Sequence, residues 1–184
     1  MSRRAWLLAF VILVAAAAIE LAMGRNLICT CGSVDLWVGA RDSPKTSQMP
    51  LDWYSLSHVV HGLLFYAAWW LVARRWPVEW RFIAALLVEA SWEMLENTPL
   101  VIDRYRATTA ALGYSGDSVL NSMSDILMMA LGFLVAGKLP VRASIVLLIV
   151  LELVPLFVIR DNLALNIWTL LAPSKAVQAW QAGG

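Results

Sequence analysis

Long apolar stretches separated by short polar ones dominate this chain, and their lengths give the first prediction. A helix that spans a bilayer needs about 17–25 mostly apolar residues. Five apolar stretches of the chain come close to this length. A sixth apolar stretch, residues 163–171, is too short to span the bilayer and is expected to lie at the membrane interface. The pattern predicts an all-α fold: a polytopic membrane helix bundle in a single domain, residues 1–184, with about five transmembrane helices plus a short C-terminal interfacial helix. The expected spans lie near residues 6–23, 57–73, 80–94, 119–137 and 143–159.

The composition supports a membrane protein and excludes several other classes. Hydrophobic residues make up 60% of the chain and charged residues 15%, against about 25% charged residues in a typical soluble domain. A soluble globule of this size could not bury so much apolar surface. The net charge of +1 creates no field that would attract a polyanion. We therefore expect the lipid bilayer as the surroundings of this chain, and we exclude nucleic acid as a partner.

The connections between the expected spans are very unequal in length, which predicts an orientation. Residues 74–79 and 138–142 form short connections, whereas residues 24–56 and 96–118 form long ones. Basic residues are densest in the N-terminal segment and in the short connections, and the positive-inside rule places such segments in the cytoplasm. We predict a multi-pass protein of the bacterial inner membrane, with a cytoplasmic N-terminus and a periplasmic C-terminus. The first stretch is interpreted as an uncleaved span because it is long for a signal peptide.

Polar residues inside the expected spans recur at helical spacing and converge at one depth. Each set lies at the end of its span that adjoins a long connection. Ionised side chains at mid-membrane cost about 2.5–3.5 kcal/mol on insertion scales, so they must face one another, other polar groups or water. Residues of this kind are functional candidates by default. The sets are His58 and His61; Glu89, Glu93 and Glu96; and Asp117, Asn121 and Asp125.

General acid–base chemistry is one role for this cluster, because neighbouring carboxylates and histidines can supply one acid and one base. Glu93, with Glu89 or Glu96, is the candidate base, and His58 or His61 would share the proton transfer. The alternative is a structural polar clamp between helices. The candidate catalytic residues are Glu93, Glu96, His58, His61 and Asp117; Asp117 is equally a candidate N-cap of the following helix.

Two arginines lie in the long connection 96–118, between the glutamates and Asp117 in sequence. Arg104 and Arg106 are candidates for binding an anionic lipid headgroup, because the guanidinium fork suits phosphate. They could equally act as counter-ions of the carboxylates or position the loop. Asn121 and Asp125 complete the candidate substrate-binding residues.

A metal site and a cysteine pair are further possibilities that the residues leave open. His58, His61 and Glu93 are the candidate metal ligands, since imidazole and carboxylate suit a borderline metal; the cofactor is otherwise unknown. Cys29 and Cys31 form a Cys-x-Cys pair, for which a redox or metal role competes with two unpaired thiols. A disulfide across one residue would be strained.

Six separated motifs, in order between about residues 29 and 140, resemble an uncharacterised family of small bacterial multi-pass inner-membrane proteins. The resemblance implies a multi-pass membrane protein and no assigned activity. One departure is visible: a histidine is expected after Ser47-Gln48, where Met49 stands, which weakens a zinc site that needs a third histidine. The motifs begin at Cys31-Gly32, Asp52-Trp53-Tyr54-Ser55, Ser57-His58, Trp92-Glu93, Ile102-Asp103-Arg104-Tyr105-Arg106 and Gly116-Asp117-Ser118.

A second, looser likeness is to VanZ-like membrane proteins, through Glu93, Arg106, Asp117 and Asn121 in that order. Two functions from different classes stay open at this point. The first is a membrane-embedded enzyme acting on a lipid or lipid-linked substrate at the outer leaflet. The second is a non-enzymatic accessory subunit or binding protein with a membrane-protein partner. A transporter is less favoured because the chain shows no internal repeat.

Overall fold

The computed structural model describes the chain except for residues 42, 110–112 and 184. The regular secondary structure of the described residues is almost all α-helix, as the apolar pattern predicts, with one short pair of strands. The elements are α1 (Arg3–Ala22), β1 (Trp37–Val38), β2 (Leu51–Asp52), α2 (Ser55–Val72), α3 (Val78–Glu96), α4 (Pro99–Thr108), α5 (Val119–Ala136), α6 (Val141–Ile159), α7 (Leu163–Leu171) and α8 (Lys175–Gln181).

Four helices are long and apolar enough to cross a membrane: α1, α2, α5 and α6. The fifth expected span lies within α3, which has 19 residues but is not among those four. Its sequence carries Glu79, Arg81, Glu89, Glu93 and Glu96, which lower its hydropathy. Because α3 packs against α1, α2 and α5, Glu89 and Glu93 are buried within the bundle, and the membrane crossing of α3 stays a prediction.

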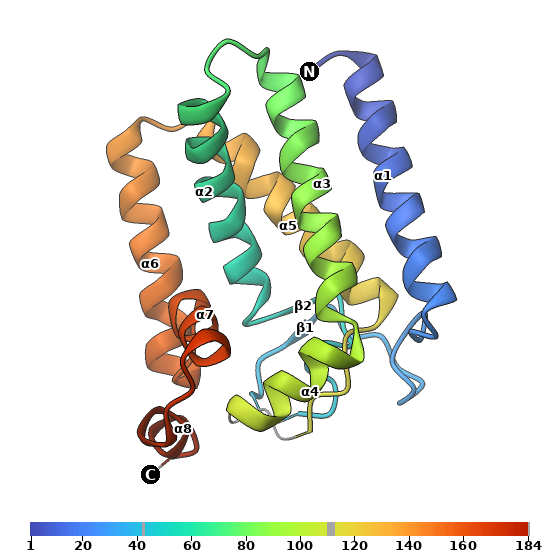
Figure 1. The fold of residues 1–184 in the computed structure, drawn as a ribbon, viewed down its shortest axis with the longest axis vertical. Helices are drawn as coiled ribbons and strands as arrows, with labels where there is room; N and C mark the ends of the chain where they lie inside the picture. The colour runs from blue at the N-terminus through green and yellow to red at the C-terminus, as the bar shows by residue number, and fades with distance from the viewer. Residues whose placement is uncertain (42, 110–112, 184) are drawn as a thin grey trace.

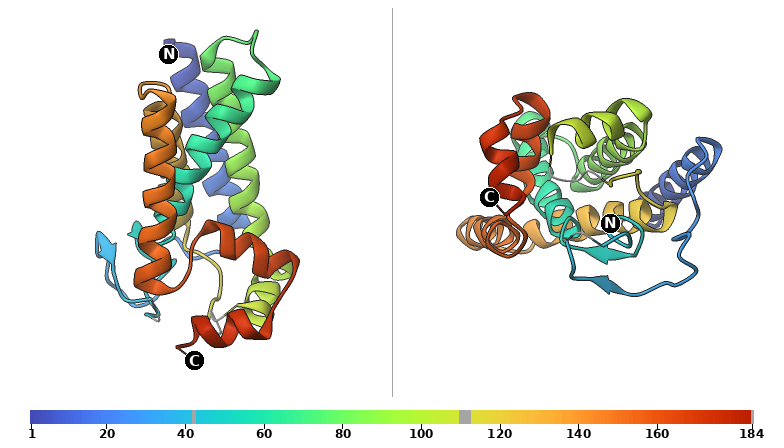
Figure 2. Two further views of the ribbon diagram at one scale, coloured as in Figure 1. Left: turned by 90° about the vertical axis from the view of Figure 1, so that its left-hand side faces the viewer. Right: turned by 90° about the horizontal axis from the view of Figure 1, so that it is seen from below.

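The two ends of the bundle differ, as Figure 1 shows. The N-terminus, the α2–α3 turn and the α5–α6 turn lie at one end, here called the turn end. The strands, α4, α7 and α8 lie at the opposite end, here called the loop end. Seen from below in Figure 2, α4 and the α7–α8 segment lie on one side of the loop end and the strands on the other. The structure thus gathers the long connections at one end.

Helices α2 and α5 cross at unusually short distance because each has a glycine at the contact. A Cβ on Gly62 would lie 2.1 Å from the Met129 carbonyl oxygen, and one on Gly132 would lie 2.2 Å from that of Val59. Small residues at helix crossings let backbones approach closely in membrane bundles. These two glycines therefore set the distance between two of the helices that carry the polar residues.

An apolar core fills the turn-end half of the bundle. Phe82 of α3 and Phe133 of α5 are both 1% exposed, and their ring centroids are 5.4 Å apart. Tyr66 of α2 packs edge-on against Phe133 at 5.1 Å. In contrast, the apolar residues of α6 largely face outward, with Phe157 79% exposed. Such an outward apolar face suits contact with lipid.

The loop end contains one helix that the sequence predicted, α7, and several elements that it did not predict: α4, α8 and the two strands. The interfacial helix was expected at residues 163–171 and α7 spans Leu163–Leu171, but α8 follows it. Helix α4 occupies part of the connection interpreted as a loop, with Pro99 at its start, where proline is favoured. Its polar residues conceal any apolar periodicity. Strands β1 and β2 pair in parallel, Trp37 opposite Leu51, and join the middle of the first long connection to its C-terminal part.

Candidate functional site

Three helices bring five titratable residues together near the loop end. Helix α2 supplies His58 and His61 from its first turns, α3 supplies Glu89 and Glu93 from its last turns, and α5 supplies Asp125. We call these five residues the polar cluster. Four of them are at most 7% exposed, and His61 is partly buried. The convergence expected from the spacing is therefore present among these residues.

Both histidines contact the same carboxylate. His58 Nδ1 lies 2.6 Å from Glu89 Oε1, and His61 Nδ1 lies 3.0 Å from the same oxygen. The His58 and His61 rings meet edge to face at 5.2 Å, and His61 stacks on Phe65 at 5.6 Å. Glu89, rather than the Glu93 expected from the sequence, is thus the carboxylate that the two histidines share. Its position one turn from Glu93 is the signal that could have indicated it.

The two remaining carboxylates of the cluster approach His58 from other sides. Glu93 Oε1 lies 3.4 Å from His58 Nδ1, and Asp125 Oδ2 lies 3.8 Å from His58 Nε2. Neither Glu93 Oε1 nor Asp125 Oδ1 accepts a hydrogen bond from a described residue, although both atoms are buried. Buried polar atoms are almost always paired, so these two oxygens are chemically available.

Asn97, a residue of the Trp92–Asn97 family motif to which the sequence assigned no role, organises the polar residues closest to the loops. Its Nδ2 lies 3.1 Å from Asp117 Oδ2 and 3.2 Å from Ser122 Oγ, and its Oδ1 accepts from the Asp117 backbone N–H at 2.7 Å. Burial raises the pKa of Asp117 to about 6, although the Tyr114 hydroxyl donates to it. The sequence signals for Asn97 were its place in that motif and its position directly after Glu96, at the end of α3.

The structure changes two expectations for the start of α5: the identity of its N-cap residue and the role of Asn121. The N-cap is Ser118, whose Oγ accepts from the Asn121 backbone N–H at 3.1 Å, and not Asp117. The Asn121 side chain donates to the Met49 carbonyl at 2.8 Å and so ties α5 to the first long connection. Asn121 therefore has a structural partner, whereas Asp125, one turn further on, belongs to the polar cluster.

Glu96 lies at the last turn of α3, beyond the cluster, and its charge acts on Asp117 and Tyr105. Burial, followed by the Glu96 carboxylate, raises the pKa of the Tyr105 hydroxyl well above its usual value. Glu20 of α1 is also fully buried, and the charges of Asp117 and Arg25 act on it. The structure thus adds Glu20 to the buried acidic residues of the bundle.

The two candidate arginines contact backbone carbonyls in the structure. Arg104 donates from Nε and Nη2 to the Leu170 carbonyl of α7, at 3.0 and 2.7 Å. Arg106 donates from Nε to the Tyr114 carbonyl and lies 3.7 Å from Asp103. Among the described residues, no ion pair joins either arginine to the polar cluster. Of the three roles considered, these contacts favour loop positioning over the counter-ion role.

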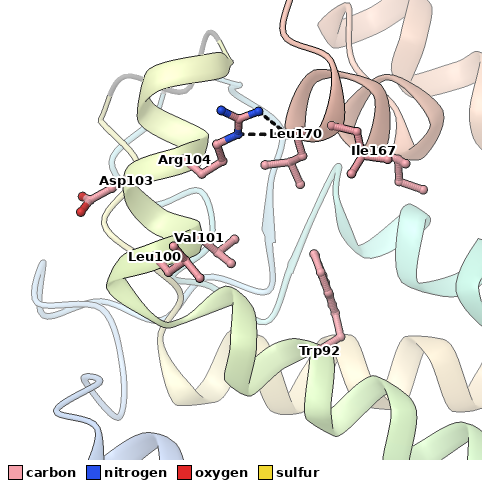
Figure 3. A pocket seen from close by; sticks show the side chains of 8 residues that line it. Trp92, Leu100, Val101, Asp103, Arg104, Ile167 and Leu170 are labelled. Atoms are coloured by element: carbon pink, nitrogen blue, oxygen red, sulfur yellow. Dashed lines mark hydrogen bonds between the residues drawn. The ribbon is translucent and has the colours of Figure 1, made fainter.

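An apolar pocket of about 580 Å³ lies beside the cluster, between α3, α4 and α7. Figure 3 shows Trp92 on its floor, Ile167 and Leu170 on the α7 side, and Arg104 at its rim. Trp92 immediately precedes Glu93, so α3 presents one residue to the pocket and its neighbour to the cluster. Its full lining is Trp92, Leu100, Val101, Asp103, Arg104, Ile167, Leu170 and Leu171.

Cys29 and Cys31 are joined by a disulfide bond in the first long connection. The expectation of two unpaired thiols is therefore wrong. The bond removes both thiols as metal ligands, and Cys29 is buried next to Val38 and Met49. The pair therefore belongs to the packing of the loop end.

The comparisons with known proteins place the chain among uncharacterised relatives. The sequence profile of the family described as "Protein of unknown function (DUF2585)" matches residues 20–183. A UPF0314 protein of Paracoccus denitrificans is 54% identical over 173 residues, which cover 94% of this chain and 90% of the relative. A UPF0314 protein of Novosphingobium aromaticivorans is 52% identical, covering 97% of this chain and 92% of the relative.

A third relative, the UPF0314 protein of Sphingopyxis alaskensis, is 49% identical over 100% of this chain and 97% of its own length. No solved structure matches the chain at a significant level. The matches confirm the resemblance to an uncharacterised family and assign no activity.

Proposed function

Because this chain belongs to the family described as proteins of unknown function (DUF2585), we propose its function from the geometry of its own polar cluster. The protein is a membrane-embedded enzyme that acts on a lipid or lipid-linked substrate through acid–base chemistry of the cluster. Its partner is an anionic lipid, reached from the leaflet at the loop end. The positive-inside rule assigns that end to the periplasmic side of the inner membrane.

One observation carries the proposal: two buried carboxylate oxygens stand unpaired next to an imidazole. Glu93 Oε1 and Asp125 Oδ1 have no hydrogen-bond donor among the described residues, and both carboxylates flank His58. A purely structural clamp gains stability from satisfied hydrogen bonds, and a half-satisfied network is worse than an apolar core. Unpaired acceptors beside a proton carrier are what a general base needs.

The contacts divide the roles among the cluster residues. Glu89 holds both imidazoles through their Nδ1 atoms, which fixes the orientation of the rings. Glu93 is the base, since its free oxygen can accept a proton from a bound substrate. His58 Nδ1, 3.4 Å from Glu93, can take that proton on as its own Nδ1 proton passes to Glu89, 2.6 Å away. Asp125, at 3.8 Å from His58 Nε2, stabilises the positive charge that develops on the imidazole during this relay.

The neighbouring pocket supports a lipid as the substrate class. Its walls are mostly apolar, which suits an acyl or prenyl chain, and Arg104 lies at the rim. A guanidinium has five N–H donors, and two of the Arg104 nitrogens bind the Leu170 carbonyl. The arginine therefore keeps capacity for an anionic headgroup while it joins α4 to α7.

The test compares Glu93→Gln with a matched control, Glu152→Gln, in a strain that lacks the gene. Glutamine keeps the shape of glutamate and accepts hydrogen bonds, but it cannot take up a proton. Glu152 lies on α6, where its oxygens accept from the Leu163 and Ala164 backbone N–H groups, away from the cluster. We expect the lipid species that accumulate in the deletion strain to persist with Glu93→Gln and to disappear with Glu152→Gln.

The readout is the lipid composition by mass spectrometry, with membrane insertion and thermal stability of each variant measured in parallel. Among the described residues Arg104 does not pair with Glu93, and His58 keeps Glu89 and Asp125 as carboxylate partners in Glu93→Gln, so the variant is expected to fold. Full restoration of the lipid composition by Glu93→Gln would contradict the catalytic role. The accessory-subunit hypothesis would then replace it.

A further inference from the structure

The two histidines of the polar cluster and Glu89 converge as the ligands of a metal site would. We propose that His58, His61 and Glu89 bind a divalent metal ion of the zinc class. The site goes beyond the proposed function, because metal binding can occur and be measured without any substrate. The chain contains two histidines in all, and both belong to this ligand set.

The geometry places three ligand atoms around one point. One donor atom from each residue lies within 4.8 Å of the other two. The Nδ1 atoms of His58 and His61 approach Glu89 Oε1 to 2.6 and 3.0 Å. Zinc binds imidazole nitrogen and carboxylate oxygen at about 2.0–2.2 Å. Ligand atoms this close together can therefore surround a single ion after small shifts of the side chains.

The ligand types select the class of metal. Two imidazoles and one carboxylate suit zinc and related borderline ions, whereas calcium and magnesium prefer oxygen ligands throughout. No thiol is available, because the two cysteines of the chain are joined in a disulfide in the first long connection. Three protein ligands of the His–His–Glu type leave a fourth position open, which is typical of catalytic rather than structural zinc. A third histidine in place of Met49 is therefore not required.

The surroundings of the ligands provide an independent observation. Ligating histidines usually direct their second nitrogen at a carboxylate, which orients the ring. His58 does so: Nε2 faces Asp125 Oδ2 at 3.8 Å, while Nδ1 faces Glu89. The buried Glu93 Oε1, 3.4 Å from His58 Nδ1, has no hydrogen-bond donor among the described residues. A bound cation, or water on it, would occupy the space that this oxygen faces.

The charge balance of the cluster also favours a cation. Glu89, Glu93 and Asp125 are at most 4% exposed. The ion pairs that the described residues form with them come from His58 and His61 alone, and not from lysine or arginine. Uncompensated charges inside a membrane bundle are strongly unfavourable. A divalent ion would offset part of this carboxylate charge.

The experiment measures metal binding by the full-length protein, purified in detergent with an affinity tag that contains no histidine. The chelator-treated protein is titrated with Zn²⁺ against a competing chelator and, separately, with Co²⁺, whose visible absorption reports tetrahedral nitrogen and oxygen ligands. We expect the wild type to bind one equivalent. Glu89→Gln and His61→Ala each remove a proposed ligand and should weaken Zn²⁺ binding by more than about 100-fold. This loss exceeds the decrease in affinity that is usual when a residue hydrogen-bonded to a ligand is replaced.

Two further variants separate the ligands from their surroundings. Asp125→Asn should weaken binding by about 10–100-fold, as expected for an outer-shell carboxylate. Glu20→Gln is the matched control: it changes a fully buried carboxylate of α1 that is not a ligand, and binding should stay at the wild-type level.

Absence of the Co²⁺ absorption from folded wild-type protein would overturn the site, whatever the variants do. Equal affinities for wild type and Glu89→Gln would do the same. A failed metal site leaves the acid–base proposal intact, because the lipid comparison with Glu93→Gln does not depend on a metal. Conversely, metal binding without any lipid phenotype would retain this site and remove the enzymatic function.

Discussion

The turn-end and loop-end halves of the same three helices are built on opposite principles. In the turn-end half, α2, α3 and α5 meet through Tyr66, Phe82 and Phe133, whose aromatic rings interlock. In the loop-end half, the same helices meet through the polar cluster, with two unpaired carboxylate oxygens. The difference shows that packing in one half stabilises the bundle and thereby permits an unfavourable polar arrangement in the other.

The largest expected effect comes from removing packing in the turn-end half. Phe133→Ala deletes a ring that is 1% exposed and contacts both Phe82 and Tyr66. Loss of a buried phenylalanine typically costs about 3–5 kcal/mol. We expect a large fall in the apparent melting temperature of the detergent-solubilised protein. Asp125→Asn in the loop-end half should leave it unchanged or raise it, and a comparable fall there would contradict the division between the two halves.

A second, smaller effect is expected where the two halves meet, at the α2–α5 crossing. Gly62→Ala would place a methyl group 2.1 Å from the Met129 carbonyl oxygen, so the helices must separate. Overpacking of this kind costs up to about 3 kcal/mol. The control is Gly137→Ala, whose methyl group would meet the Tyr66 ring at 3.3 Å. Thermal unfolding should separate the two variants, and metal or lipid assays of Gly62→Ala would show whether the crossing also positions His61.

The smallest of these effects is the pH dependence of stability that arises from Asp161, a loop-end residue outside the polar cluster. Burial raises the pKa of Asp161 to about 6, despite hydrogen bonds from the Tyr54 hydroxyl and the Asn162 backbone N–H. Folded Asp161 therefore binds its proton more tightly than unfolded Asp161, and this protonation contributes to the free energy of unfolding at low pH. The contribution falls as pH rises from about 4, the pKa in the unfolded chain, to about 6, the pKa in the folded protein. Over this range the free energy of unfolding decreases by roughly 2 kcal/mol.

Asp161→Asn removes this titration. Melting temperatures measured from pH 4 to 7 should therefore depend less on pH in the variant than in the wild type, with the variant relatively more stable at pH 7. Parallel pH profiles for the two proteins would show that ionised Asp161 is well accommodated. The loop end would then tolerate buried charge better than its contacts indicate.

The candidate site shows how far sequence spacing can go. The i, i+3 and i, i+4 spacings of His58, His61, Glu89 and Glu93 indicated shared helix faces, and the structure brings these residues together. The choice between Glu89 and Glu93 as the partner of both histidines depends on the axial register of α2 against α3. A shift by one helical turn exchanges the two carboxylates, and no local pattern encodes that shift.

The loop end was least accessible to prediction, because its contacts join segments far apart in the chain. Arg104 binds a carbonyl 66 residues away, and Asn97 reaches Asp117 and Ser122 across a connection of mixed polarity. Helix α4 lacked a clear apolar period and was interpreted as a loop. Side-chain to backbone hydrogen bonds of this kind follow from the path of the chain, and not from residue type.

The sequence by itself determined the helical class, the positions of the long apolar segments and the side of each on which polar residues recur. These are local properties: length, hydropathy and a period of 3.6 residues depend only on the segment itself. The tertiary structure alone decided that Glu89 contacts both histidines and that Glu93 and Asp125 each keep an oxygen without a hydrogen-bond donor among the described residues. It also decided that Arg104 donates to the Leu170 carbonyl of α7. Such choices arise from the rotation and register of packed helices, which the close contact at Gly62 and Gly132 fixes only once the chain has folded.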